Sequence, residues 1–459
     1  MCLILSLGVG HNTRVGLDGF NLALARGTGV ATYGRVLSHA LRGLGRPIDV
    51  IYGLDVSSRV SAAERETLFF ARLAEGGERP GPAKATFRQA VRRAFLSPAT
   101  REPVEVPVAG RVVRDGLAER LPAFDRLFTL GGLFDLGARH FRRYGRFMTV
   151  RLPDPPAIMH WTYPLPLRLA GALNVYTVHD LVPLRLPFTT LDDKVYHQRL
   201  LRRCLATADH VVTVSEASRR DILDLFPIDA DRVTNTYQAA IAPAALDEAT
   251  LTTRLRTLFD LKPQGYFLFF GAIEPKKNVG RLIEAYLAAD IQTPLVLVGP
   301  RAWLAADELR LLDGAHGERL PGVARIRRID YLPARHLRTL TQGARAVVFP
   351  SLYEGFGLPA LEAMALGAPV MAGSTAALPE VVGTAARLVD PYDVDAIAQA
   401  LRDLDGDAAL RARLAAAGPD QARRFSLGAY QDRLAALHAR LLDPATFHRS
   451  GGQTLGDVP

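Results

Sequence analysis

The chain has 459 residues, of which 48% are hydrophobic and 22% are charged, and its formal net charge is +9. This length exceeds one ordinary hydrophobic core, so we expect two globular domains rather than a disordered or fibrous chain. The two cysteines, Cys2 and Cys204, exclude a disulfide framework and lack the spacing of a metal site.

The location in the cell is indicated by what the chain lacks. No stretch approaches the roughly 20 apolar residues that a membrane-spanning helix needs. Residues 1–7 are apolar but have no basic start, so they make a poor signal peptide, and we expect residues 1–13 to be a loose extension. We therefore expect a cytoplasmic protein.

Positive charge is concentrated between Arg88 and Arg151, where 13 arginines face 6 acidic residues. Such a surplus attracts nucleic acid, an anionic membrane or an anionic substrate. No zinc-ligand spacing or aromatic ladder accompanies it, so we expect no nucleic-acid partner. A solvated surface and a peripheral location on the cytoplasmic face of the inner membrane both agree with it.

Strands and helices alternate in the first half of the chain. A strand at 14–18 precedes the glycine turn 27–29 and an amphipathic helix at 30–44, which is typical of a doubly wound parallel sheet. Neither this turn nor Gly8-Val9-Gly10 completes the Gly-x-Gly-x-x-Gly fingerprint, which argues against a nicotinamide or flavin enzyme. Further strands are expected at 47–53, 157–160, 174–178, 208–214 and 232–237.

The second half repeats this alternation, so we predict a second parallel sheet covered by helices. Its expected strands lie at 266–270, 294–298, 323–326, 346–349, 368–371 and 386–389. The pattern between 55 and 150 is irregular, and 445–459 is expected to fray. The predicted units are a first domain at 1–245, a linker at 246–265, a second domain at 266–425 and a helix at 426–445 that packs back toward the first domain.

The most informative stretch runs from 346 to 379. After a strand and the loop 351–358, Pro359 opens an apolar helix in which Glu362 is the only charged residue between Gly355 and Pro379. A carboxylate in a buried helix is costly unless something hydrogen-bonds to it. Glu354, eight positions earlier, completes a Glu-x7-Glu pair around a glycine-rich turn.

This pair predicts a nucleotide-sugar site. Gly355 and Gly357 let the backbone approach a ligand, and the first turn of the following helix suits a phosphate. Carboxylates would repel that phosphate, so we expect them to accept hydrogen bonds from sugar hydroxyls. The alternative is a plain glycine and proline loop, with Glu362 in a structural salt bridge.

Titratable side chains that could contact a ligand follow two other predicted strands. His179 and Asp180 follow the strand 174–178, where open α/β sheets bind ligands, although a lone histidine is often structural. Lys276 and Lys277 follow the strand 266–270 and suit a diphosphate, with solvated loop charges as the alternative.

Three Asp-x-Asp motifs lie away from such strand ends, so we expect no catalytic metal and no cofactor. Protein cations and helix N-termini must then stabilise a leaving diphosphate. The motifs occupy 229–231, 393–395 and 405–407, and the second of them is expected to cap a helix.

Together these motifs resemble those of the retaining glycosyltransferases of family 4, which have the GT-B fold of two Rossmann-like α/β domains facing a cleft. The matching segments are TVHDLVPL (177–184), ADHVVTVSEASRRDIL (208–223), FGAIEPKKN (270–278), FPSLYEGFGLPALEAMALGAPV (349–370), LPEVVG (378–383) and LVDPYDVDAIAQAL (388–401).

The resemblance implies that the second domain binds the donor and the first binds the acceptor. Glu362 would hold the ribose, Glu354 would face the sugar, and Lys277 would hold the diphosphate. The implied catalytic residues are His179 and Glu354; the donor-binding residues are Gly29, Lys277, Glu354, Gly355, Phe356, Gly357, Leu358 and Glu362; the acceptor-binding residues are Tyr163 and Asp180. Many members carry an arginine where this chain has Ala272, so Lys276 or an arginine of the first domain would compensate.

The resemblance also implies the reaction. EPKKN loops with a YEGFG turn are typical of mannosyltransferases, so we expect transfer of mannose from GDP-mannose, by same-face attack, to a glycan or polyprenyl-diphosphate-linked acceptor in polysaccharide assembly. The alternatives are a nucleotide-sugar epimerase, a phosphorylase, or a non-catalytic sugar-binding partner. An epimerase would need no acceptor, and a phosphorylase would need phosphate.

Overall fold

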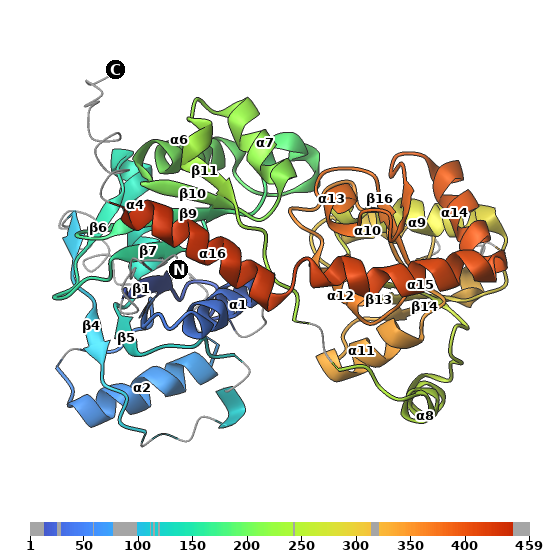
Figure 1. The fold of residues 1–459 in the computed structure, drawn as a ribbon, viewed down its shortest axis with the longest axis horizontal. Helices are drawn as coiled ribbons and strands as arrows, with labels where there is room; N and C mark the ends of the chain where they lie inside the picture. The colour runs from blue at the N-terminus through green and yellow to red at the C-terminus, as the bar shows by residue number, and fades with distance from the viewer. Residues whose placement is uncertain are drawn as a thin grey trace, which may run out of the picture.

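The computed structural model describes residues 13–24, 29–57, 59–76, 99–110, 112, 115–117, 120–241, 244–313 and 321–443. These residues form two lobes that lie side by side (Figure 1). Residues 1–12 of the expected extension, Gly8-Val9-Gly10, residues 27 and 28 of the glycine turn, and the tail at 445–459 lie outside the described residues.

The first lobe is built on an eight-stranded sheet of order β11-β10-β9-β7-β1-β2-β5-β4. All neighbouring strands are parallel except β4, which is antiparallel to β5. Its apolar strands are buried, as in a sheet covered on both faces. The strands are β1 Val15–Asp18, β2 Ile48–Tyr52, β4 Val104–Val106, β5 Arg126–Thr129, β7 Ile158–Trp161, β9 Leu173–Val178, β10 His210–Thr213 and β11 Val233–Asn235.

Helices and a small sheet complete this lobe. The helices are α1 Gly29–Gly43, α2 Ala62–Ala74, α4 Leu133–Tyr144, α5 Val182–Arg185, α6 Lys194–Thr207 and α7 Glu216–Leu225. The small sheet, of order β3-β6-β8, contains β3 Thr100–Arg101, β6 Met148–Val150 and β8 Leu167–Leu169.

The second lobe is built on a parallel six-stranded sheet of order β14-β13-β12-β15-β16-β17. Its strands are β12 Phe267–Phe270, β13 Leu295–Val298, β14 Ile326–Ile329, β15 Ala346–Phe349, β16 Val370–Gly373 and β17 Arg387–Val389. Its helices are α8 Glu248–Phe259, α9 Val279–Ala289, α10 Ala305–Glu308, α11 Ala334–Gly343, α12 Leu358–Ala365, α13 Leu378–Val382, α14 Val394–Gly406 and α15 Ala408–Arg423.

Three segments differ from the sequence prediction. The strand expected at 323–326 begins only at Ile326, because residues 323–325 form a 3-10 turn. The expected linker at 246–265 contains α8, which buries Leu251 and Leu255 in the core of the second lobe. The irregular stretch 55–150 contains β5, whose apolar residues are too few for its pattern to stand out.

The last helix, α16 (Leu427–Leu442), crosses back over the first lobe and packs on α1 (Figure 1). Tyr430 and Leu434 are fully buried in the same apolar cluster as Leu37 of α1. This cluster also takes in Phe356 and Phe425, so apolar packing continues from one lobe to the other.

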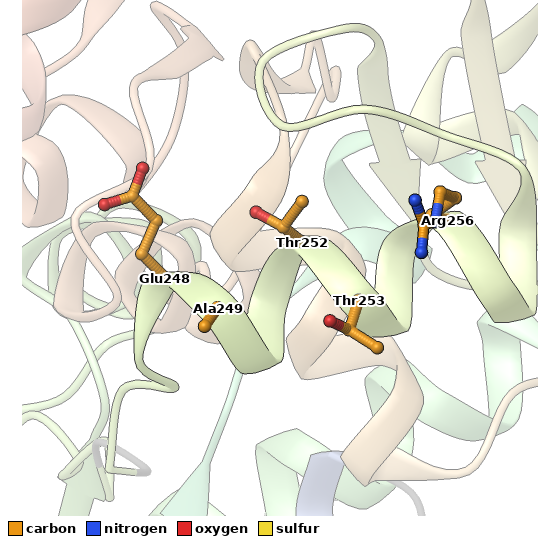
Figure 2. Close-up of a pocket in the computed structure, with 5 residues that line it drawn as sticks. All are labelled: Glu248, Ala249, Thr252, Thr253 and Arg256. Atoms are coloured by element: carbon orange, nitrogen blue, oxygen red, sulfur yellow. The ribbon is translucent and has the colours of Figure 1, made fainter.

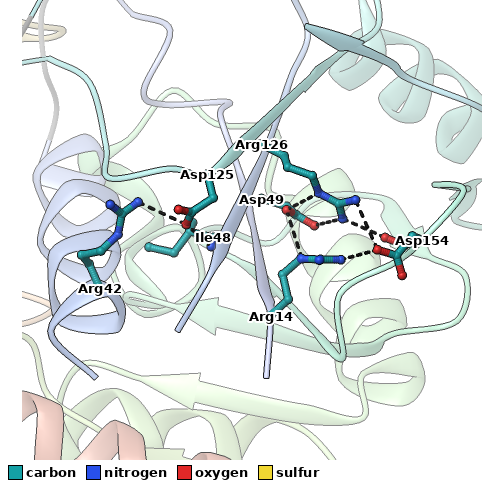
Figure 3. Close-up of polar contacts among 7 residues, drawn as sticks. All are labelled: Arg14, Arg42, Ile48, Asp49, Asp125, Arg126 and Asp154. Carbon is teal, nitrogen blue, oxygen red and sulfur yellow. Dashed lines mark hydrogen bonds and ion pairs between the residues drawn. The ribbon is translucent and has the colours of Figure 1, made fainter. Parts of the chain in front are cut away.

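An ion-pair network joins β1, β2 and β5 near their amino ends (Figure 3). The fully buried Asp49 accepts two hydrogen bonds from Arg126, at 2.9 and 2.6 Å, and lies 3.7 Å from Arg14. Both arginines also contact the exposed Asp154, and chiefly Arg14 lowers the pKa of that carboxyl. Arg126 thus compensates a carboxylate that would be costly to bury alone.

We expect Arg126→Ala to lower the free energy of unfolding by about 2 kcal/mol, because Asp49 would stay buried with only the more distant Arg14 beside it. Denaturant unfolding measures this loss. Arg423→Ala is the matched control, since the Arg423–Asp420 pair is exposed and such pairs contribute under about 1 kcal/mol. Equal losses in the two variants would contradict the prediction.

Candidate functional site

The lobes meet where loops from the carboxyl ends of β9 and β15 touch. A Cβ atom added to Gly355 would lie 2.6 Å from the His179 carbonyl oxygen and 3.0 Å from the Asp180 Cβ. Only glycine allows this approach, because real Cβ contacts are not that short. The structure therefore brings together the glycine loop and the His179-Asp180 pair that the sequence singled out.

Glu354 is held in an ion pair at this junction. Its carboxylate accepts hydrogen bonds from the Lys277 Nζ at 2.7 and 2.9 Å and from the Ser351 hydroxyl at 2.8 Å. Burial acts to raise the pKa of Glu354, but the charges of Lys277 and Lys276 outweigh it and lower the pKa. The group is therefore ionised at neutral pH. The sequence resemblance assigns Glu354 and Lys277 to different parts of a ligand, so this pair is not expected from the sequence.

Lys276 lies among carboxylates from both lobes. Its Nζ is 3.6 Å from the Glu274 carboxylate, and its side chain is only 21% exposed. Burial acts to lower the pKa of Lys276, but Asp180, Glu274 and Glu354 together raise it, so the ammonium keeps its proton. Asp180 belongs to the first lobe, so this lysine is an electrostatic contact between the lobes.

Tyr163, predicted to bind the acceptor, lies in the same electrostatic environment. Burial raises the pKa of its phenol, the charges of Asp180 and Asp192 raise it further, and Lys276 opposes them. The hydroxyl therefore stays protonated and can donate a hydrogen bond.

His179 is oriented by the backbone of the first lobe. Its Nε2 lies 2.9 Å from the Thr162 carbonyl oxygen, which can only accept, so Nε2 carries the proton. Burial lowers the pKa of His179, and the neutral ring packs edge-on against Tyr33 at 4.8 Å between centroids. Nδ1 is thereby left as an acceptor.

Glu362 has no hydrogen-bond or ion-pair partner among the residues that the structure describes. Burial raises the pKa of its carboxyl to about 7. The structural salt bridge considered from the sequence is therefore not found in the described part of the chain. A half-buried carboxyl without a partner is a ready acceptor for ligand hydroxyl groups.

The glycine loop leads directly into α12. Gly357 precedes this helix with a φ of 103°, a left-handed conformation that favours glycine, and Leu358 begins the first turn. The Phe356 side chain instead packs against Tyr237 and Phe425 in the core between the lobes. The loop therefore offers backbone groups to a ligand, whereas the Phe356 ring does not face it.

Gly29 begins α1, and among the described residues outside its own helical turn no atom lies within 4 Å of a Cβ added there. Because residues 25–28 are outside the described residues, its predicted contact with the donor stays a prediction.

Two serines that the sequence does not single out donate hydrogen bonds to residues of the candidate site. Ser351 donates to Glu354, as described above, and Ser218 of α7 donates to the His179 carbonyl oxygen at 2.8 Å. Ser218 lies within the segment 208–223 that carries the family resemblance, but nothing in its spacing pointed to His179.

Two of the three Asp-x-Asp motifs, at 393–395 and 405–407, have structural roles. Asp393 caps α14 through the Ala396 N–H, as predicted, and Asp407 caps α15 through the Leu410 N–H. Asp405 pairs with Arg345 at 2.8 Å.

A shallow hollow of ≈ 510 Å³ follows the exposed face of α8 (Figure 2). None of the predicted site residues lines it, and α8 lies at the lower edge of the second lobe, whereas α7 lies at the top of the first (Figure 1). The hollow is therefore separate from the junction. Its lining consists of Glu248, Ala249, Thr252, Thr253 and Arg256.

Comparisons with known proteins match both halves of the chain to glycosyltransferases. Residues 258–421 match the family model of the glycosyl transferases group 1, and residues 95–237 match that of glycosyltransferase family 4. An O-antigen chain mannosyltransferase B from Escherichia coli is 37% identical over 268 residues, which are 57% of this chain and 68% of that protein. A serotype-specific mannosyltransferase WbdA from Escherichia coli is 27% identical over 376 residues, 73% of this chain but only 44% of that protein.

Solved structures share the fold at low sequence identity. A sucrose-phosphate synthase from Thermosynechococcus elongatus superposes with a TM-score of 0.61 at 19% identity and covers 94% of this chain and 99% of its own. Anabaena HepE in complex with UDP and glucose superposes with a TM-score of 0.62 at 16% identity and covers 93% of this chain and 99% of its own.

The raised pKa of Glu362 predicts a pH-dependent stability. The pKa of this carboxyl is near 4.5 in the unfolded chain and about 7 in the folded protein. Its contribution to the free energy of unfolding is therefore fully present below pH 4.5 and is lost as the pH rises through about 7. We expect Glu362→Gln to be more stable than the wild type by about 3 kcal/mol under mildly alkaline conditions and equally stable in acid. Urea unfolding across this range measures the difference.

Glu248→Gln, on the exposed start of α8, is the control and should follow the wild type at every pH. If Glu362→Gln also follows the wild type, Glu362 does not carry a raised pKa.

Proposed function

Because the chain belongs to the family 4 glycosyltransferases and has their GT-B fold, we propose that it transfers mannose from GDP-mannose to a lipid-linked or oligosaccharide acceptor, with retention at the anomeric carbon. The two family models and the mannosyltransferase relatives confirm the predicted family and hexosyltransferase class, and the solved structures confirm the predicted fold. The names of both relatives support mannose as the sugar, and the name of the O-antigen chain mannosyltransferase supports O-antigen polysaccharide as the product.

The observation that carries the donor site is the unpartnered carboxyl of Glu362 on α12, one turn after the glycine loop. Two ribose hydroxyls would supply the hydrogen bonds that this carboxyl lacks in the described structure. The free N–H groups in the first turn of α12 would then hold the adjoining phosphate.

The Glu354–Lys277 pair supplies both charges that the reacting end of the donor needs. A diphosphate would draw the Lys277 ammonium toward itself and release Glu354 to accept bonds from sugar hydroxyls. Lys276 would then supply the second cation, in place of the arginine absent at Ala272. These lysines and the α12 N-terminus support the proposal that transfer needs no metal ion or other cofactor.

In the proposed reaction, the bond from the anomeric carbon to the diphosphate oxygen breaks while the acceptor hydroxyl attacks from the same face. The hydroxyl proton passes to that leaving oxygen, so the protein need not supply a base. His179 would orient the sugar through Nδ1, and Tyr163 and Asp180 would hold the acceptor.

An anionic membrane surface is the proposed site of the acceptor. Arg139, Arg142, Arg143 and Arg146 are all exposed at the C-terminal end of α4, together with Tyr144. The Arg142 guanidinium lies over the Tyr196 ring of α6, which links this end of α4 to a neighbouring exposed apolar group. That group comprises Phe188, Leu191 and Val195, each more than 60% exposed.

Basic and apolar side chains on one surface suit anionic lipid headgroups and the acyl boundary beneath them. Within the described ranges, every helix is too short or too polar to span a bilayer, so the proposed contact is peripheral. The relatives described above are transferases, and we therefore propose neither the epimerase or phosphorylase nor the non-catalytic partner.

A thermal-shift panel of GDP-mannose, UDP-glucose and ADP-glucose tests the donor. We expect GDP-mannose to stabilise the wild type most, and Glu362→Ala to weaken this binding by roughly 10- to 100-fold, because bonds to a charged group are lost. Glu354→Gln should keep most of the affinity but lower turnover on the order of 100-fold. Glu248→Ala is the control for both measurements.

Stronger stabilisation by another donor would overturn GDP-mannose, and unchanged affinity in Glu362→Ala would overturn the assignment of the ribose site. Loss of turnover on adding a chelator, restored by a divalent cation, would overturn transfer without metal.

Sedimentation with phosphatidylglycerol-rich vesicles tests the membrane surface. We expect the wild type to bind at low salt and the double variant Arg142→Glu/Arg143→Glu to bind at least about tenfold more weakly, since each basic residue contributes about 1 kcal/mol. Arg310→Glu/Arg413→Glu makes the same charge change on exposed arginines of the second lobe and should bind normally. Equal weakening in the two double variants would contradict this assignment.

A further inference from the structure

The Glu380 carboxylate of α13 reaches across the junction to the N-terminus of α7 in the other lobe. It accepts the Glu216 N–H at 3.0 Å and the Ala217 N–H at 2.9 Å, from residues 164 and 163 positions away in the chain. The Tyr237 hydroxyl lies 3.3 Å from the same carboxylate. Three donors from the first lobe thus meet one side chain of the second.

These bonds complete the N-terminus of α7. The first four N–H groups of a helix have no partner inside it. Ser215 caps α7, because its hydroxyl accepts the Ser218 N–H, and its carbonyl oxygen accepts the Arg219 N–H in the first bond of the helix itself. Glu380 accepts the N–H groups of the first two helical residues, Glu216 and Ala217. A negative charge is also favourable at this end of a helix, and bonds to a carboxylate are stronger than neutral ones.

The turn of α7 that Glu380 holds is also bonded to the site. The Ser218 hydroxyl donates to the His179 carbonyl oxygen at 2.8 Å and lies 3.5 Å from the Gly355 carbonyl oxygen. The position of α7 therefore bears directly on the point where the glycine loop meets His179.

The segment before Glu380 is likewise joined to the glycine loop. The Ala377 N–H donates to the Glu354 carbonyl oxygen at 3.3 Å, and a Cβ added to Gly357 would lie 2.8 Å from the Leu378 side chain. Glu380 is thus coupled to Glu354 on its own lobe and, through α7, to His179 on the other.

We propose that Glu380 is a positioning residue for the transfer reaction: it holds the lobes together so that the Glu354–Gly357 loop stays against His179 and Asp180. This role rests on the proposed function of that site. Glu380 does not touch Glu362 or Lys277 in the described structure, so its loss should leave donor binding by the second lobe intact while fewer molecules have the two halves of the site in register.

Other contacts across the junction limit the effect. The Tyr353 hydroxyl is hydrogen-bonded to Asp221, and the Trp303 indole N–H donates to the Thr189 carbonyl oxygen at 2.8 Å. Removing Glu380 should therefore shift the equilibrium between closed and open lobes by about tenfold rather than abolish closure.

Trp303 offers a reporter of closure in the native protein. The chain has two tryptophans, and Trp161 is fully buried inside the first lobe, so it supplies a constant background. Trp303 is 39% exposed and bonded across the junction. Opening the lobes would break that bond and shift its emission to longer wavelength.

The test compares Glu380→Ala and Glu380→Gln with the wild type, and uses Asp247→Ala as the matched control. Asp247 also caps a helix, because its carboxylate accepts the Thr250 N–H at 2.8 Å. Asp247 and Thr250 both belong to the second half of the chain, so this cap does not join the two lobes. We expect Glu380→Ala to shift Trp303 emission to the red without ligand and to lower kcat by up to about tenfold, with donor affinity unchanged. Glu380→Gln keeps one acceptor oxygen, so its Trp303 emission and its kcat should lie between those of the wild type and of Glu380→Ala.

A fall in donor affinity equal to the fall in kcat, or unshifted emission in Glu380→Ala, would overturn the proposal. So would the same emission shift in Asp247→Ala. The emission measurement needs no substrate, so it stands even if the wild type transfers no sugar, an outcome that would overturn the proposed function instead.

Discussion

The close approach of Gly355 to the His179 carbonyl oxygen is the constraint on which the rest of the site depends. A methyl group at Gly355 would meet that oxygen at 2.6 Å, so the two lobes can only come this near because the residue has no side chain. The approach puts loops from the carboxyl ends of β9 and β15 in contact. It also brings Asp180 of the first lobe close enough to Lys276 of the second lobe to raise the pKa of Lys276.

Charges at this junction fall into two kinds. Glu354 and Lys277 compensate each other, and Ser351 satisfies part of the same carboxylate, so both charges are kept in a buried place. Glu362 is left without a described partner, and its raised pKa reflects that cost. In the proposed function, a diphosphate would release the paired carboxylate, and the unpaired one would accept hydroxyl groups at the other end of a nucleotide sugar.

Apolar packing makes the two lobes mechanically dependent on each other. Phe356 follows directly after Gly355 and packs with Tyr237 and Phe425, and α16 carries this core onto α1. Movement of one lobe must therefore disturb aromatic contacts next to the glycine loop. Polar contacts such as those of Glu380 can bias this movement at modest free-energy cost, because the apolar contacts already limit its range.

The sequence by itself determined the two-sheet α/β architecture, the positions of nearly all the main strands and the segments that form the site. Apolar runs between glycine and proline turns are local signals, and they failed where the signal was weak, as at β5 in the stretch 55–150, at α8 in the expected linker and at β14 after residue 325. The Glu-x7-Glu spacing also placed the start of α12 between the two carboxylates, with Glu354 in the loop and Glu362 one turn into the helix. Tertiary structure alone decided that Lys277 pairs with Glu354, that Glu362 stays unpaired, and that Glu380 caps α7. These contacts join residues tens to hundreds of positions apart, and whether two side chains meet over such separations depends on how the lobes pack, which no local pattern encodes.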